Sequence, residues 1–195
     1  MAAKSNITGM ALCLFLVCLV CGGILGAVYS VTKQPIEDAA AAEALAAISE
    51  VLPEGGEISS VQQAGGMEYY TSTSGDEVKA YAVKSTAGGF GGPITIMVGV
   101  LPDGSIWNTR VLSHSETPGL GAKCTTDEAF ISQWKGYNGS FTVKKDGGDV
   151  DAITASTITS RAYAQALAQA SALVHSLEGA DADAASGASV KKEEE

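Results

Sequence analysis

A long apolar run stands near the start of the chain. Residues 10–29 are almost wholly apolar, and residues 5–32 carry no charge. About 20 such residues span a bilayer as a helix, whereas the apolar part of a cleavable signal peptide has about 7–15. We therefore expect residues 1–31 to form an uncleaved transmembrane anchor. Lys4 precedes the run, while Glu37 and Asp38 follow it, and this slight bias predicts an inside amino terminus with the body of the chain on the extracytoplasmic side.

The next pattern is helical. Residues 34–52 carry apolar positions at helical spacing, Pro35 fits a first helical turn, and Pro53 and Gly55-Gly56 end the run. This segment predicts a helical stalk within residues 32–60, leading from the membrane into the domain.

Strand patterns follow. Residues 68–84 alternate and are rich in Thr, Tyr and Val around a turn at Ser74-Gly75-Asp76, which predicts a hairpin. Residues 94–100 are nearly continuously apolar, as in a central strand, and Asp103-Gly104 marks a tight turn before a strand at residues 106–112. A further short strand is expected at residues 141–145.

Two helices are expected after the sheet. One is short, over residues 127–134, and the other begins near Thr159 or Ser160, either of which is a suitable cap, and runs to Leu177. The order predicts an α+β fold, an antiparallel sheet with flanking helices, over residues 61–177. Residues 178–195 mix Gly, Ala, Ser and acidic residues, and we expect them to be a disordered acidic tail.

The composition argues against several classes of function. The chain has 195 residues and a net charge of −10, which argues against nucleic acid, because phosphate backbones are bound by clustered Lys and Arg. Three of the four cysteines lie in the apolar run and Cys124 stands alone, so a disulfide framework is not expected. The two histidines lack clustered partners, and no nucleophile–base pair is evident, so neither a metal site nor hydrolytic catalysis is expected.

Candidate chemistry gathers at residues 151–160, a run of small and hydroxyl-bearing residues just before the last helix. Small residues let a ligand approach the backbone, and a helix start presents unpaired N–H groups and a positive dipole end, so the turn suits a phosphate. The residues alone leave open which hydroxyl is used; the candidates are Thr154, Ser156, Thr157 and Thr159.

The pattern Asp151-x-x-Thr154-Ala155-Ser156-Thr157 resembles the flavinylation motif of FMN-binding domains, with Ala155 where Gly is usual and Ser156 where Ala is usual. The resemblance implies that Thr157 is joined to FMN through a phosphodiester by a dedicated flavin transferase. The phosphodiester would keep one negative charge, which a helix start stabilises by about 0.3–1 kcal/mol.

A second match lies upstream. Phe90-Gly91-Gly92-Pro93-Ile94, Asp103-Gly104, and the run Val111-Leu112-x-His114-x-Glu116-Thr117-Pro118-Gly119-Leu120-Gly121 are similar in order and spacing to the RnfG family, the G-type flavoprotein of Rnf electron-transport complexes. That family implies an electron carrier, with covalent FMN, in a membrane complex that moves electrons between ferredoxin and NAD and couples this to ion transport. The implied partners are the other subunits of the complex, including another covalent flavin carrier.

The resemblance also implies the flavin site. The ring is expected against residues 116–121, with Pro118 and Leu120 covering its face and the backbone of Gly119 and Gly121 at its edge. Glu116 either contacts the flavin or braces the loop, and Lys123 is either a phosphate partner or a solvated charge. The full expected set is Glu116, Thr117, Pro118, Gly119, Leu120, Gly121, Lys123, Asp151, Thr154, Ala155, Ser156, Thr157 and Thr159.

Three alternatives remain open. The related NqrC flavoprotein of the sodium-translocating NADH:quinone reductase shares both motifs, although it is usually longer between anchor and flavin domain. The second alternative is a subunit of another extracytoplasmic reductase. The short length and the lack of a second catalytic domain argue against an autonomous reductase. A chain that has lost the flavin would be a membrane-anchored assembly module, for which Ala155-Ser156 is the one hint.

Overall fold

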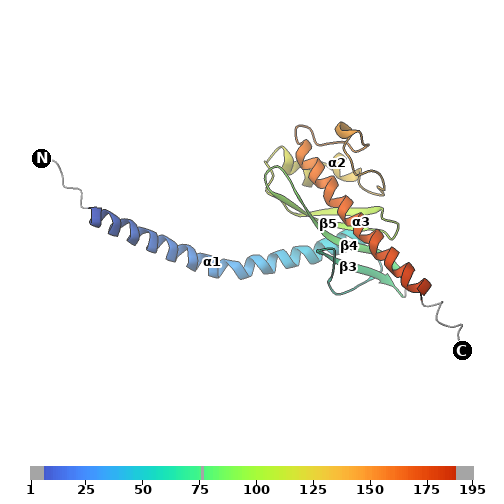
Figure 1. Ribbon diagram of the computed structural model, residues 1–195, viewed down its shortest axis with the longest axis horizontal. Helices are drawn as coiled ribbons and strands as arrows, with labels where there is room; N and C mark the ends of the chain where they lie inside the picture. The colour runs from blue at the N-terminus through green and yellow to red at the C-terminus, as the bar shows by residue number, and fades with distance from the viewer. Residues whose placement is uncertain (1–6, 76, 188–195) are drawn as a thin grey trace, which may run out of the picture. The chain divides into compact units, whose positions relative to one another are not determined.

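The structure is a computed structural model that describes residues 7–75 and 77–187. The chain divides into two units, with the boundary between Glu43 and Ala44. The first helix, α1, spans Ile7–Val51 (Figure 1). Among the described residues it is the one helix long and apolar enough to cross a membrane, which agrees with the expected anchor.

The anchor and the stalk are one helix rather than two. Pro35 lies inside α1, whereas the sequence placed it in the first turn of a new helix. A proline removes only one N–H from the ladder. Two side-chain pairs four residues apart bracket it, Gln34 with Asp38 at 3.2 Å and Lys33 with Glu37 at 3.8 Å, and pairs at this spacing support a helix.

The sheet has six strands and is antiparallel throughout. Its order is β1-β3-β4-β5-β6, with β2 also paired to β3. The strands are β1 (Glu57–Ile58), β2 (Gln62–Ala64), β3 (Met67–Ser74), β4 (Glu77–Gly88), β5 (Pro93–Val100) and β6 (Ile106–Ser113). The expected hairpin is β3–β4, and β5 is a buried central strand between β4 and β6, as its apolar run predicted. The sheet therefore begins at Glu57, within the expected stalk.

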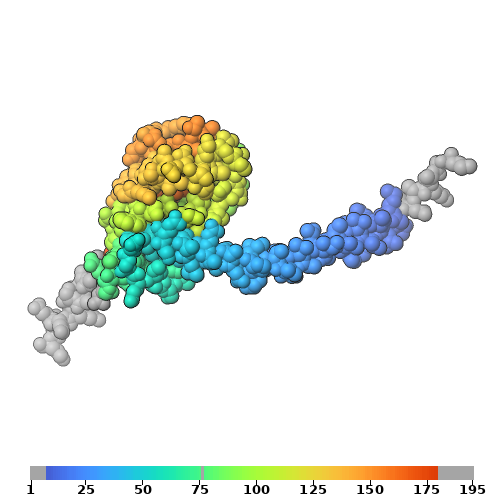
Figure 2. All heavy atoms as spheres, turned by 180° about the vertical axis from the view of Figure 1, so that it is seen from behind, coloured from blue at the N-terminus to red at the C-terminus, as the bar shows by residue number. Residues whose placement is uncertain are grey.

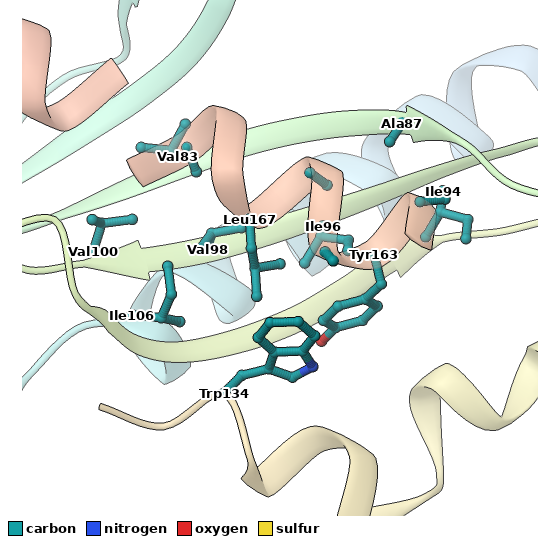
Figure 3. Packing of buried hydrophobic residues seen from close by; sticks show 14 of the residues in the cluster. Val83, Ala87, Ile94, Ile96, Val98, Val100, Ile106, Trp134, Tyr163 and Leu167 are labelled. Carbon is teal, nitrogen blue, oxygen red and sulfur yellow. The ribbon is translucent and has the colours of Figure 1, made fainter. Parts of the chain in front are cut away.

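The larger core lies between one sheet face and helix α3 (Thr157–Gly187), which crosses β4 and β5 (Figure 1). Alternate β5 residues Ile94, Ile96 and Val98 meet α3 there, because successive strand side chains point to opposite faces. Figure 3 shows Trp134 and Tyr163 side by side under Leu167, and their stacked ring centroids are 5.7 Å apart. This core holds the beginning of α3 in place.

The last turns of α1, within the second unit, cover the opposite sheet face. Ala47, Ile48, Val51 and Leu52 form a second core with Ala80, Ala82 and Met97. A Cβ on Gly99 would lie 1.8 Å from the Val51 carbonyl oxygen, so only glycine allows this approach. Asn108 donates to the Glu50 carbonyl oxygen at 3.0 Å, which occupies one of the acceptors left free at the helix end.

The connection from β6 to α3 is mostly irregular. It contains the 3₁₀ turn η1 (Gly121–Thr125), helix α2 (Glu128–Ser132) and the 3₁₀ turn η2 (Lys144–Asp146). In Figure 2 these residues, yellow to orange, gather together at one end of the domain. The helix expected at residues 127–134 is α2, and Asp127 caps it by accepting from the Phe130 N–H at 3.3 Å.

The strand expected at residues 141–145 is wrong. Only an isolated bridge joins Val143 to Val150, and the chain turns through η2 at Lys144. Gly147, with φ of 88°, reverses the chain directly after η2, so too few residues remain extended to make a strand. Phe141 and Val143, two residues apart, both pack on the core, which explains the misleading strand pattern.

Helix α3 is longer than its apolar pattern indicates. The sequence ended it at Leu177, whereas its backbone continues to Gly187. Residues 180–187 are rich in alanine, the residue with the highest helix propensity, so the helix continues after its apolar face ends. The rest of the expected tail, residues 188–195, lies outside the described residues.

Candidate functional site

A pocket of about 360 Å³ opens where three separate segments meet. One wall comes from the loop after β6, through Glu116, Thr117, Leu120 and Gly121. The opposite wall is the start of α3, residues 155–159, and Phe90 from the β4–β5 loop completes the lining. The large apolar side chains Phe90, Leu120 and Ile158 are all substantially exposed here, which suits a ligand with an apolar face.

Glu116 ties two of the three segments together. Its side chain is buried, and Oε1 accepts the backbone N–H groups of Phe90 at 2.7 Å and Gly91 at 3.4 Å. Its own N–H donates to His114 Nδ1 at 3.2 Å. A buried carboxylate needs such donors. Of the two roles left open by the sequence, bracing the loop is the one that these contacts display.

Glycines surround the Glu116 carboxylate. A Cβ on Gly89 would lie 2.1 Å from Oε1, and a Cβ on Gly121 would lie 2.3 Å from Oε2 and 2.7 Å from Thr159 Oγ1. Neither position therefore accepts a side chain unless the carboxylate moves. Glycine is needed at both positions because the backbone lies so close to the Glu116 carboxylate, and not because of its backbone φ angle.

The start of α3 is set by the loop before it. Ile153 N–H donates to Ser160 Oγ at 2.9 Å, and Ser160 Oγ donates to the Ser156 carbonyl oxygen at 3.0 Å. These bonds fold residues 153–156 against the first helical turn. The helix begins at Thr157, so the expected start at Thr159 or Ser160 is wrong by at least two residues. The Ser160 hydroxyl closes the preceding loop instead of capping the helix.

The backbone conformation at Ala155 shows what this departure from the flavinylation motif costs. Its φ is 61°, in the left-handed region that glycine adopts readily and other residues adopt at a cost. Glycine is the usual residue at this motif position, and the backbone shown here is the conformation that favours it. The alanine keeps the same turn with some strain.

The four candidate hydroxyl residues have different surroundings. Ser156 and Thr159 line the pocket but are buried, while Thr154 is exposed and lies outside the lining. Thr157 lines the pocket and is half-buried, and Lys145 Nζ donates to its Oγ1 at 2.9 Å. Thr157 is therefore the lining hydroxyl that is both accessible and in contact with a cation.

Two ion pairs fasten η2 to this segment. Lys144 Nζ contacts both carboxylate oxygens of Asp151, at 2.7 and 2.8 Å, and Asp146 accepts two hydrogen bonds of 2.6 Å from Arg161. The Arg161 guanidinium holds the pKa of the Asp146 carboxyl below its ordinary value. Both pairs are exposed, so their role is local geometry more than stability.

Cys124 lies in η1, which begins at the lining residue Gly121, and is fully buried. Burial, followed by the nearby charge of Glu116, raises the pKa of its thiol to about 11. The neighbouring Tyr163 hydroxyl donates to Thr109 Oγ1 at 2.8 Å, and burial raises the pKa of that phenol as well. Both groups are neutral at physiological pH and serve as packing. Within residues 7–75 and 77–187, no three His, Cys, Asp or Glu side chains gather as a metal site would require.

The pocket brings together most of the expected site residues. Those in its lining are Glu116, Thr117, Leu120, Gly121, Ala155, Ser156, Thr157 and Thr159, while Pro118, Gly119, Lys123, Asp151 and Thr154 are outside it. Sequence reasoning missed Phe90, Ile158 and Lys145 as site residues. An exposed apolar residue within a glycine-rich loop is a signal that could have pointed to Phe90. The contact of Lys145 depends on the turn η2, which the strand-like pattern of residues 141–145 did not reveal.

Comparison with known proteins identifies the family of this chain. Two family models match the chain, the FMN-binding domain over residues 89–172 and the RnfG N-terminal region over residues 1–51. The chain is 36% identical over 110 residues to the G subunit of the proton-translocating ferredoxin:NAD(+) oxidoreductase complex of Clostridium ljungdahlii, covering 54% of this chain and 59% of that relative. The chain thus spans little more than half the length of that relative.

A second relative is matched over more of its length. The G subunit of the ion-translocating oxidoreductase complex of Cereibacter sphaeroides is 34% identical over 175 residues, covering 80% of this chain and 78% of the relative. Among solved structures, the crystal structure of Shewanella oneidensis NqrC matches with a TM-score of 0.41 and 25% identity, covering 52% and 53% of the two chains. The chain therefore belongs to the RnfG family of ion-translocating oxidoreductase complexes, and it contains an FMN-binding domain.

Proposed function

We propose that this chain is a membrane-anchored flavoprotein that relays electrons through FMN attached covalently to Thr157, within an ion-translocating ferredoxin:NAD oxidoreductase complex. The observation that carries the proposal is the pocket between the loop containing Glu116 and the start of α3, with the Thr157 hydroxyl on its wall. The names of the relatives support the type of complex.

The residues present fit FMN. Phe90, Leu120 and Ile158 offer apolar surface for a flat ring, and Thr157 is the first residue of α3, where free N–H groups and the helix dipole favour a phosphate. Lys145 adds a positive charge at the same hydroxyl. The pocket volume lies within the range of about 300–1,000 Å³ that is usual for small-molecule sites.

When bound, FMN supplies one- and two-electron transfer, and the chain supplies its position and surroundings. Leu120 and Phe90, which line the pocket, would limit the access of water to a ring bound there. Glu116 holds both loops in place through the backbone of Phe90, so its carboxylate acts on the shape of the pocket. A covalent link suits a carrier outside the cytoplasm, because it prevents loss of FMN by dissociation.

The membrane and the partners complete the proposal. α1 anchors the chain, and the charge bias around it favours an extracytoplasmic domain. The partners are the membrane subunits of the complex, and a flavin transferase acts during maturation. A cysteine introduced at exposed Glu54 should react with an impermeant maleimide added outside intact cells, and protection there would overturn the sidedness.

Mass analysis tests the covalent flavin. The full chain, produced in a host that contains a flavin transferase, should gain the mass of FMN minus water, and peptide mapping should place the gain on Thr157. Thr157→Ala should lose the gain, while Thr154→Ala should keep it. An unmodified wild-type chain under these conditions would overturn the assignment and leave the assembly-module alternative.

Co-purification tests the type of complex. The tagged, flavinylated chain should isolate with the other membrane subunits and support ferredoxin-dependent reduction of NAD. Isolation with an NADH:quinone reductase would favour that alternative instead.

A further inference from the structure

The turn η2 touches the flavin-attachment segment with three consecutive residues. Lys144 bonds Asp151, Lys145 bonds Thr157 and Asp146 bonds Arg161, at distances of 2.6–2.9 Å. The flanking ion pairs fix the direction of the turn on either side of Lys145. The middle residue is therefore held with its ammonium group over the first residue of α3.

The hydrogen-bond partner of the Lys145 ammonium differs in kind from those of Lys144 and Arg161. Lys144 and Arg161 each have a carboxylate partner, whereas Lys145 makes no ion pair with any residue in the described part of the chain, although its charge helps to lower the pKa of the Asp146 carboxyl. Its partner is the neutral Thr157 hydroxyl at 2.9 Å. A cation directed at a hydroxyl, beside a helix start, is complementary to an anion formed on that hydroxyl.

We propose that Lys145 is the residue that positions the Thr157 hydroxyl for flavin attachment and then pairs with the resulting phosphodiester. This inference rests on the proposed function. It also explains the choice among four hydroxyls, because Thr154, Ser156 and Thr159 make no bond with a cation in the described structure.

Attachment from a flavin dinucleotide donor forms one bond and breaks another. The Thr157 oxygen forms a bond to the phosphorus on the flavin side, the P–O bond of the pyrophosphate breaks, and a nucleoside monophosphate leaves with the electron pair. The hydroxyl proton goes to a base of the transferase or to water, because the Lys145 ammonium is already protonated. A hydroxyl oxygen has two lone pairs, so one accepts from Lys145 while the other attacks.

Lys145 contributes in two ways. Its ammonium orients the Thr157 hydroxyl and stabilises the negative charge that develops on the oxygen as the proton leaves. After attachment it neutralises the phosphodiester. Because Lys145 is exposed, the transferase can reach the hydroxyl without displacing a buried group.

The test is a kinetic assay of flavin attachment on the full chain. Unmodified chain in detergent is mixed with purified flavin transferase and a flavin dinucleotide, and modified chain is counted by mass. Lys145→Met should lower kcat about ten- to a hundredfold, as expected for loss of a hydrogen bond from a charged group, with KM for the chain unchanged. Lys145→Arg should restore most of the rate, and exposed Lys135→Met is the matched control with wild-type rate.

Several outcomes would overturn the inference. Attachment to Lys145→Met at the wild-type rate would do so, as would a change confined to KM, which would indicate recognition by the transferase. Failure of Lys145→Arg to restore the rate would exclude a role for the charge. If Thr157→Ala is unmodified while Lys145→Met is normal, the proposed function stands without this inference; an unmodified wild-type chain would overturn both.

Discussion

Glu116 Oε1 accepts the backbone N–H of Phe90 at 2.7 Å, and the two residues are 26 positions apart in the sequence. This bond joins the β4–β5 loop to the loop after β6. It closes one side of the pocket without using a residue of α3. The Glu116 carboxylate therefore holds the two loops of the pocket wall together, and its removal should affect both loops.

Glu116→Ala should lower the free energy of unfolding by about 1–3 kcal/mol, because the Phe90 and Gly91 N–H groups lose their acceptor. Urea unfolding followed by tryptophan fluorescence measures this, since both tryptophans lie in the domain. Exposed Glu54→Ala is the control and should change stability by less than about 0.5 kcal/mol. Equal stability of the two variants would contradict the bracing role.

Gly121→Ala should disrupt the pocket more than an ordinary glycine substitution. The new Cβ would lie 2.3 Å from Glu116 Oε2, so we expect a loss of stability of roughly 1–3 kcal/mol, typical of overpacking, and reduced flavin attachment. Gly88→Ala is the matched control, because nothing lies within 4 Å of its Cβ. Comparable attachment to both variants would show that the carboxylate can move.

Ala155→Gly should stabilise the domain. Alanine at φ of 61° destabilises the folded state by about 1–2 kcal/mol, because it is in the left-handed conformation. Glycine avoids this strain but loses about 0.5–1 kcal/mol of stability, because its unfolded chain has more conformational freedom. We expect a net gain of roughly 0.5–1 kcal/mol by denaturant unfolding. Ala152→Gly, outside the left-handed region, should destabilise instead, and a gain there would contradict the explanation.

Cys124 should make stability fall at alkaline pH. Burial raises the pKa of its thiol from 9.0 to about 11, so the unfolded chain ionises first. The stabilisation is complete below about pH 9 and is lost as the pH rises toward 11. Unfolding measured from pH 8 to 10.5 should show a smaller decline for Cys124→Ala than for wild type; parallel curves would contradict this.

Much of the sheet could be predicted from alternation. The β3–β4 hairpin and the buried strand β5 follow directly from side chains that alternate or remain apolar, because packing on two faces imposes those patterns. The continuity of α1 through Pro35 could not be predicted in this way, since local pairs compensate for a single missing donor. The full length of α3 could not be predicted from its apolar pattern, because the last part is helical through the helix propensity of its alanines alone.

The site was partly accessible from the sequence. The meeting of Thr157 with residues 116–121 was implied by resemblance to a family, while spacing alone left four hydroxyls equivalent. Lys145 was missed because residues 141–145 carry the pattern of a strand, whereas Gly147 turns the chain back. Its contact depends on tertiary folding of an irregular segment, for which no periodic signal exists.

The packing of Val51 against Gly99 has a practical consequence for isolating the domain without its anchor. A fragment that begins at Ala44 keeps both cores, in agreement with the boundary of the second unit. A fragment that begins at residue 89, where the FMN-binding match starts, would leave β5 as an open edge and expose the apolar face around Met97. Such an edge invites pairing with other chains, so the shorter fragment should aggregate where the longer one remains soluble.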